Sequence, residues 1–255
     1  MEQRVSSDFA AERRLAVTPE IAGWTGLTFR TYGFRAGHPI DGESVDDEVC
    51  MLFLTGSATV RVDGEIWDVE GRADVFSGPP HCIYLPPRRS YLLSPRTDCE
   101  VAYARMPARG RFSPRFMPPG ALTTQEWGAG NTRRQVTTLL GAGDTEHLLC
   151  LEVRTPPGNW SDCPVHEQDA PAPDPGREAT LAEVCYHRID GEAGWALQRL
   201  RSDDGAVDDA IVIRHGDAVM VRQGSHPAVA APGHPLYTLH VLAHDAPSTR
   251  SDAEK

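Results

Sequence analysis

Hydrophobic and β-branched residues recur along this sequence as short runs separated by glycine, proline and aspartate. Runs of this length and composition are typical of β-strands, several of them buried on both faces. In the first half we predict strands at 49–54, 58–62, 66–69, 83–85 and 100–104. In the second half we predict strands at 136–140, 148–153, 184–188, 196–201, 211–213, 218–221 and 237–242. No long amphipathic helical pattern is present, and the weak one near Thr123–Trp127 is short.

The turns between these runs predict how the strands are arranged. Asp63-Gly64 separates two alternating runs, and Asp-Gly is typical of a type I′ hairpin turn, whose central residues need positive φ. A Pro- and Arg-rich passage at 106–120 divides the two sets of runs. Each set also contains a glycine turn, an apolar run and a second turn, at 71–87 and 216–227, which indicates an internal duplication. The pattern therefore predicts an all-β chain with two tandem barrels or sandwiches.

Length and composition fit this picture and narrow the function. A chain of 255 residues with 40% hydrophobic residues accommodates one large domain or two ordinary ones. No apolar run has membrane-spanning length, and residues 1–5 lack the apolar stretch of a secretory signal, so we expect a cytoplasmic protein with no membrane partner. A net charge of −11 argues against a nucleic-acid partner. The six cysteines form no Cys-x-x-Cys pair and lie mostly in apolar runs, which predicts reduced thiols.

The chemistry of the sequence concentrates after Gly158-Asn159-Trp160-Ser161. Residues two apart on a strand face the same side, so His166 and Gln168 are expected to point into one cavity. Glu183 begins an apolar run and His226 follows a glycine turn. Three or four ligands from different strands can make a divalent-metal site with a position open for substrate. Gln168 is either a neutral oxygen ligand, weaker than imidazole, or a hydrogen-bonding residue behind the ligands.

Other interpretations of these residues stay open at this point. Ten histidines in one chain produce some suggestive spacings by chance, and in the first half His38 and His81 stand without comparable neighbours. The glycine-rich motifs of nucleotide-binding proteins and the Gly-x-Ser-x-Gly motif of serine hydrolases are absent from the sequence.

The run 152–161, with its Gly-Asn-Trp-Ser element, resembles the signature of the 5-deoxy-glucuronate isomerase family of inositol catabolism. Relatives of that family include the 4-deoxy-L-threo-5-hexosulose-uronate ketol-isomerases of pectin breakdown. The resemblance covers nearly the whole chain. Further matching segments lie at 22–24, 71–76, 84–86, 130–134, 181–186, 198–199 and 216–233.

This resemblance implies a bicupin fold, with a metal in the C-terminal cupin and a degenerate N-terminal cupin. We expect the N-terminal cupin at residues 1–120, the C-terminal cupin at 121–245 and a frayed tail at 246–255. The Pro-rich segment 169–176 is expected to be an exposed loop. A homodimer formed through sheet edges is the default expectation for such a fold.

The resemblance also implies a ligand set for a divalent ion, with zinc, manganese, iron and nickel all open. His166, Glu183 and His226 match three family ligand positions, and Gln168 occupies the position of a family histidine. Further departures lie nearby, at Cys163, Val165, Ala182 and Arg222. We therefore expect a divergent paralogue whose metal affinity, substrate or reaction differs from that of its relatives.

The implied activity is a metal-dependent aldose–ketose isomerisation of 5-deoxy-glucuronate or a related acidic sugar. A base must move a proton between neighbouring carbons, and Asp169, Glu167 and Tyr237 are the candidates. Arg199 and Gln198 are the candidates for substrate binding, since a guanidinium pairs well with a carboxylate. Two alternatives remain. One is a cupin enzyme of specialised metabolism that catalyses a dehydration, epimerisation or oxygenation, and the other is a metal-free sugar-binding cupin.

Overall fold

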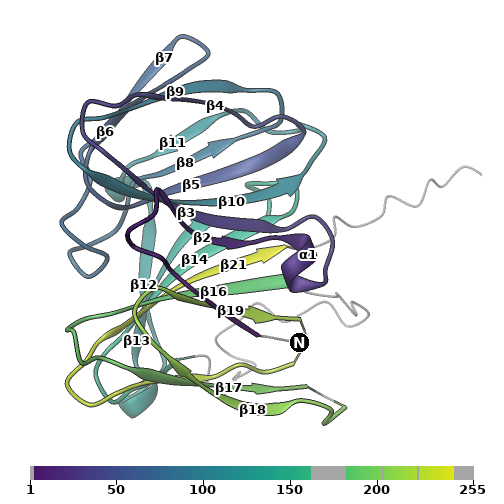
Figure 1. Cartoon of the computed structure of the whole chain (residues 1–255), viewed down its shortest axis with the longest axis vertical. Coiled ribbons are helices and arrows are strands. Elements are labelled where there is room, and N and C mark those ends of the chain that lie inside the picture. Colours follow the sequence, from purple (N-terminus) through teal and green to yellow (C-terminus); the bar gives the residue numbers. More distant parts are fainter. Residues whose placement is uncertain (1–2, 162–181, 203, 223, 244–255) are drawn as a thin grey trace, which may run out of the picture.

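The computed structural model describes residues 3–161, 182–202, 204–222 and 224–243, and these form two β-sandwiches (Figure 1). The first sandwich has a six-stranded sheet, in the order β11-β8-β5-β10-β3-β2, and a four-stranded sheet, in the order β4-β9-β6-β7. Its strands are β2 (Arg13–Val17), β3 (Thr28–Phe34), β4 (Ile40–Glu43), β5 (Asp47–Thr55), β6 (Ala58–Val62), β7 (Glu65–Val69), β8 (Cys82–Leu85), β9 (Ser90–Pro95), β10 (Cys99–Pro107) and β11 (Arg115–Met117).

The second sandwich has a seven-stranded sheet, in the order β1-β19-β16-β21-β14-β13-β12, and a four-stranded sheet, in the order β15-β20-β17-β18. Its strands are β1 (Arg4–Ser6), β12 (Thr123–Trp127), β13 (Arg134–Leu140), β14 (Leu148–Thr155), β15 (Trp160–Ser161), β16 (Ala182–Ile189), β17 (Ala196–Arg201), β18 (Asp208–Ile213), β19 (Asp217–Val221), β20 (Ala228–Ala230) and β21 (Leu236–Ala243). The N-terminal β1 thus pairs with β19 of the second sandwich and not with the strands that follow it in sequence.

Helical structure in the described residues is limited to short segments. These are α1 (Pro19–Ala22) and two 3₁₀ turns, η1 (Pro119–Ala121) and η2 (Gly130–Thr132). Within the residues that the structure describes, no helix has the length and apolarity needed to span a membrane.

The strands predicted from the hydrophobic runs are confirmed, each within an observed strand. The predicted hairpin is confirmed as well, since Asp63 and Gly64 have φ of 52° and 88° and join β6 to β7. The segment Thr123–Trp127, whose weak helical pattern is too short to predict a helix, is β12, the edge strand beside β13. Five residues are too few for an isolated helix, whereas pairing with β13 satisfies the backbone hydrogen bonds.

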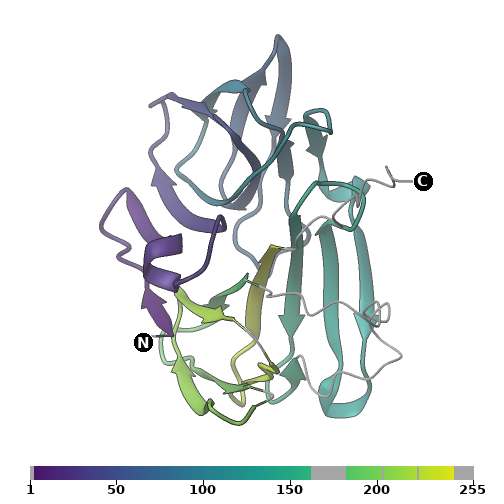
Figure 2. The same ribbon diagram turned by 90° about the vertical axis from the view of Figure 1, so that its right-hand side faces the viewer.

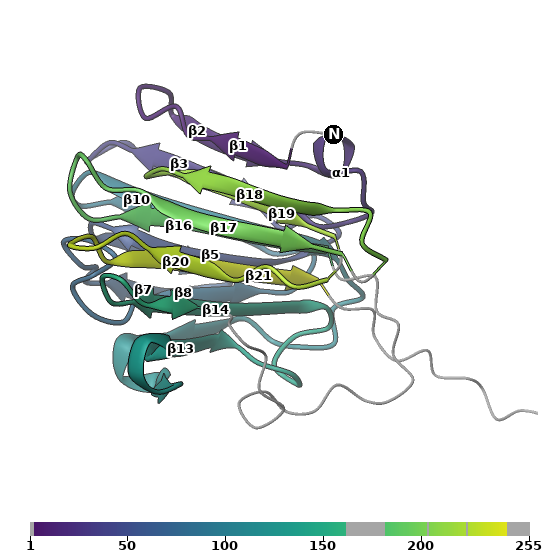
Figure 3. The ribbon, with the colours of Figure 1, turned by 90° about the horizontal axis from the view of Figure 1, so that it is seen from below.

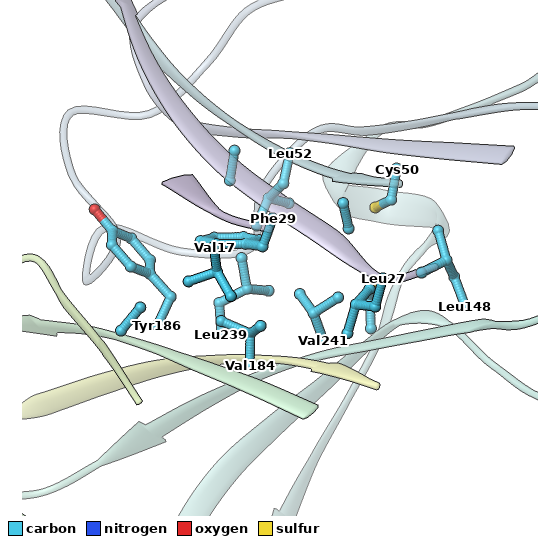
Figure 4. Close-up of a cluster of buried hydrophobic side chains, with 14 of the residues drawn as sticks. Val17, Leu27, Phe29, Cys50, Leu52, Leu148, Val184, Tyr186, Leu239 and Val241 are labelled. Atoms are coloured by element: carbon cyan, nitrogen blue, oxygen red, sulfur yellow. The ribbon is translucent and has the colours of Figure 1, made fainter. Parts of the chain in front are cut away.

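The two large sheets face each other in the middle of the molecule, and the two small sheets lie outside them (Figures 1 and 2). Between the large sheets lies an apolar cluster that both sandwiches share (Figure 4). Val17, Phe29 and Leu52 enter it from the first sandwich. Val184 and Leu239 enter it from the second. Burial of this shared cluster joins the two sandwiches into one unit.

Alternation along β16 and β21 separates this shared core from the interior of the second sandwich. Even-numbered residues of β16 and odd-numbered residues of β21 face the shared core, as Tyr186 and Tyr237 do. The opposite faces of the two strands point into the second sandwich, where β17 and β20 of the small sheet cover them (Figure 3). The side chains on these inner faces form the candidate site.

The interiors of the two sandwiches differ in composition. The first is filled by apolar side chains such as Met51, Phe53, Val60 and Leu93. The second contains buried polar side chains among its apolar ones, including Glu183, His187, Gln198, Thr238 and His240. A buried polar side chain is costly unless it has partners, so this set needs a structural or functional reason.

Candidate functional site

Four side chains of the second sandwich converge on one point. Glu183 and Cys185 lie two residues apart on β16, and His240 lies opposite Cys185 in the ladder between β16 and β21. His226 precedes β20 of the small sheet. One potential ligand atom from each residue lies within 4.8 Å of those of the other three. Of the described residues, these are the ones whose arrangement can hold a metal ion.

The Glu183 carboxylate is at the centre of this cluster. Its Oε1 lies 2.7 Å from Nδ1 of His240 and 3.3 Å from Nε2 of His226. The Sγ of Cys185 lies 3.5 Å from the same oxygen and 3.7 Å from Nδ1 of His240. All four residues are buried except His226, whose side chain retains 17% of its exposure. His226 is therefore the member of the cluster most exposed to solvent.

The charges in the cluster support one another. Burial alone would raise the pKa of Glu183, but His226 and then His240 hold it well below its usual range. Burial likewise works against a charged His226, yet the carboxylate of Glu183 and then Cys185 raise the pKa of His226 well above its ordinary value. Without a metal, the cluster therefore holds a carboxylate beside an imidazolium.

A second row of polar residues fixes the position of His226. The Nε2 of His187 lies 3.1 Å from Oε1 of Gln198, whose amide nitrogen donates to the backbone carbonyl of His226 at 3.1 Å. Because that amide oxygen can only accept, Nε2 of His187 must donate, and its Nδ1 accepts from Thr238 at 3.1 Å. Burial, followed by the proximity of His240, lowers the pKa of His187 to about 3, so its ring is neutral. This chain of hydrogen bonds holds the His226 segment against β17.

The donor set fits a divalent metal ion. Nδ1 of His226 is buried and has no hydrogen-bond partner among the described residues. Its other ring nitrogen, Nε2, faces the Glu183 carboxylate at 3.3 Å, so Nε2 is the nitrogen that points into the cluster. Imidazole nitrogen, carboxylate oxygen and thiolate sulfur are all ligands of zinc and of similar first-row metals. Glu183, Cys185, His226 and His240 could therefore hold such an ion.

The structure brings together two of the residues that the sequence predicted. Glu183 and His226 come from segments far apart in the sequence and lie in one cluster. His166, Gln168, Asp169 and Glu167 lie outside the described residues, so their roles stay predictions.

Three further candidates make other contacts in the structure, and these contacts give no support to the roles expected of them. Arg199 is on the outer face of β17, where its exposed guanidinium forms an ion pair with Asp208 at 2.7 Å. Gln198 is buried, and both ends of its amide are engaged within the protein. The hydroxyl of Tyr237 donates to Glu152 at 2.6 Å in the shared core, because Tyr237 and His240 project from opposite faces of β21.

Cys185 and His240 belong to the cluster but were not predicted from sequence. Cys185 follows Glu183 by two residues within a predicted strand, so alternation could have placed both side chains on one face. No local pattern in the sequence points to His240, because only the pairing of β16 with β21 brings it opposite Cys185.

Comparison with known proteins identifies the family of the chain. Residues 3–255 match the model of the KduI/IolB family. The chain is 36% identical to a 5-deoxy-glucuronate isomerase of Geobacillus thermodenitrificans and 37% identical to one of Geobacillus kaustophilus. Each of these matches covers 89% of this chain and 83% of the relative.

Solved structures give the same result. An IolB-like protein from Salmonella typhimurium LT2 matches with a TM-score of 0.88 at 27% identity, over 95% of this chain and 93% of that one. Oxalate decarboxylase of Bacillus subtilis matches with a TM-score of 0.62 at 12% identity, over 96% of this chain and 78% of that one, which confirms the bicupin fold and no more. The chain therefore belongs to the KduI/IolB family, a family of isomerases.

Proposed function

We propose that this protein is a metal-dependent aldose–ketose isomerase acting on 5-deoxy-glucuronate or a closely related acidic sugar, in inositol catabolism. The observation that carries the proposal is the buried Glu183 carboxylate, which faces two imidazoles inside the second sandwich. The names of the relatives in this isomerase family support the substrate class.

A divalent ion in this cluster would polarise the sugar carbonyl and stabilise the negative charge that develops as a proton moves between neighbouring carbons. The protein's own residues prepare the site for that role. Glu183 is held ionised by its histidine neighbours, so it offers a negative ligand without a prior loss of a proton. The bond from Gln198 fixes the His226 backbone, which limits the motion of the imidazole.

Burial of the cluster also matters for the reaction. Glu183 retains 4% of its exposure and Cys185 none, so these two side chains are largely removed from water. A charge that develops in such surroundings interacts more strongly with nearby dipoles and ions than it would in water. Asp169 and Glu167 stay the sequence-based candidates for the group that moves the proton.

The test combines metal analysis with an isomerase assay on the purified full chain. We expect a stoichiometric divalent metal, turnover of 5-deoxy-glucuronate, loss of turnover with a chelator and recovery on adding metal back. Glu183→Gln should lose both metal and activity. Glu126→Gln is the matched control, because Glu126 is an exposed partner of Arg133 on the edge strand. Full turnover in metal-free, chelator-treated protein would show that the proposal is wrong.

A further inference from the structure

We propose that Cys185 binds the metal as a thiolate, so that Glu183, Cys185 and His226 form a ligand set of oxygen, sulfur and nitrogen. This inference rests on the proposed function only in its premise that the cluster binds a metal ion. It goes further by identifying a sulfur ligand and the class of ion that such a ligand selects.

The position of Cys185 sets it apart from the other described cysteines. Cys50, Cys82 and Cys150 lie in the apolar core between the sandwiches, and Cys99 lies in the apolar core of the first. Cys185 also belongs to an apolar core, that of the second sandwich, but its thiol contacts a carboxylate oxygen and an imidazole nitrogen, at 3.5 Å and 3.7 Å. It is fully buried and lies on the same face of β16 as Glu183. A thiol among ligand atoms of this kind is placed for metal binding.

The distances agree with a tetrahedral site. With bonds of about 2.3 Å to sulfur and about 2.0–2.1 Å to nitrogen and oxygen, tetrahedral geometry separates a sulfur and an oxygen ligand by about 3.5 Å. The same geometry separates a nitrogen and an oxygen ligand by about 3.3 Å. The observed separations from Oε1 of Glu183 are 3.5 Å to the Sγ of Cys185 and 3.3 Å to Nε2 of His226. The Sγ of Cys185 and a nitrogen of His226 lie within 4.8 Å of each other.

His240 has a different role in this arrangement. Its Nδ1 lies 2.7 Å from Oε1 of Glu183, which is a hydrogen-bond distance and shorter than the spacing of two ligands on one metal. We therefore assign His240 as a positioning residue that donates to the ligating carboxylate. Hydrogen bonds to ligating carboxylates are a regular feature of metal sites.

Glu183, Cys185 and His226 are the ligands among the described residues, and His166 and Gln168, which lie outside them, stay the sequence-based candidates for further ligands. A sulfur ligand has a consequence for the choice of metal ion. A thiolate favours softer ions such as Zn²⁺ and Fe²⁺ over Mn²⁺ and Mg²⁺, which prefer oxygen. Of the ions that the family resemblance leaves open, the site should therefore discriminate against manganese.

X-ray absorption of the zinc-loaded, full-length wild-type protein tests the ligand set without a substitution. We expect one sulfur scatterer at about 2.3 Å, together with nitrogen and oxygen scatterers at about 2.0–2.1 Å. A shell made only of nitrogen and oxygen, in protein that binds zinc and turns over substrate, would overturn the assignment of Cys185 and leave the proposed function intact. Protein that binds no zinc and is insensitive to chelator would overturn both.

A pair of variants identifies which cysteine supplies the sulfur. Cobalt-loaded wild-type protein should show a thiolate-to-cobalt charge-transfer band, and Cys185→Ser should lose it and bind metal at least about 10-fold more weakly. Cys163→Ser is the control, because Cys163 lies outside the described residues, between β15 and β16 in sequence. Loss of the band in Cys163→Ser, or its persistence in Cys185→Ser, would refute the proposal. If Cys185→Ser does not fold, the sulfur shell of zinc-loaded Cys163→Ser decides the question. A retained shell supports Cys185 as the sulfur ligand, and loss of the shell refutes the proposal.

Discussion

Replacing Arg72 with methionine should destabilise the whole molecule, because Arg72 is part of the buried contact between the two sandwiches. Its guanidinium binds both carboxylate oxygens of Glu152 on β14, at 2.5 Å and 3.1 Å. The side chains of Arg72 and Glu152 are 4% and 0% exposed, respectively. Glu152 also accepts from the Tyr237 hydroxyl and lies 3.4 Å from Arg154.

The magnitude follows from what the substitution leaves behind. Removing one partner of a buried ion pair costs about 3–5 kcal/mol, because the other charge stays buried without compensation. Arg154 still neutralises part of the Glu152 charge, which places the expected loss at about 3–4 kcal/mol. Arg72 also donates to the carbonyls of Leu54 and Gly78, and these acceptors lose their charged donor too. For a chain of this size the loss corresponds to a fall in Tm of roughly 6–16 °C.

Chemical denaturation with guanidinium chloride, monitored by intrinsic fluorescence, measures the free energy of unfolding of both proteins. Arg96→Met is the matched control, because Arg96 forms an exposed ion pair with Asp68, for which we expect a loss of about 1 kcal/mol or less. If Arg72→Met loses no more stability than Arg96→Met, the buried pair does not hold the sandwiches together as we argue.

Three further predictions concern the second sandwich. Metal binding must displace the proton that the raised pKa of His226 retains, and binding of Cys185 as a thiolate displaces another. Metal affinity should therefore rise with pH, by up to about tenfold per unit for each proton displaced. Isothermal titration in buffers of different ionisation enthalpy measures the released protons, and the absence of proton release would contradict this prediction. Gln198→Leu should weaken zinc binding on the order of 10–100-fold, because the backbone carbonyl of His226 loses its hydrogen-bond donor. Competition with a chromophoric chelator measures the zinc affinity, and an unchanged affinity would show that Gln198 does not position His226. Arg199→Ala should leave KM for the sugar within about twofold and the free energy of unfolding within about 1 kcal/mol of the wild-type values, because the ion pair between Arg199 and Asp208 is exposed. A large rise in KM in steady-state kinetics would instead indicate that Arg199 binds the substrate.

Most of the fold could be predicted from sequence because local patterns carry it. Each predicted apolar run became a strand, and Asp63-Gly64 supplied both the turn and the register of its hairpin. Strands with weaker patterns were missed, among them β2, β3 and β9. The pairing of β1 with β19 was missed for another reason, since contacts between opposite ends of a chain leave no local trace in either segment.

The site was harder to predict because it depends on register. Sequence placed Glu183 and His226 in one site, since both matched a family pattern. The role of His240 depends on the register between β16 and β21, which places it opposite Cys185. A shift of this register by one residue would point the His240 side chain into the shared core. The alternation of side chains along β21 also explains why Tyr237 lies outside the cluster, since it projects from the other face of that strand.

The contrast between the two sandwiches indicates why the polar set is confined to one of them. In the first sandwich, side chains such as Phe53 and Leu93 fill the interior and need no partners. In the second, Glu183 is buried and ionised, which is tolerable because the imidazoles of His226 and His240 compensate its charge. Each member of the cluster is therefore stable only in the presence of the others. Replacing Cys185 or His240 should therefore change the surroundings of Glu183 most. We expect a larger effect on metal affinity than on the free energy of unfolding.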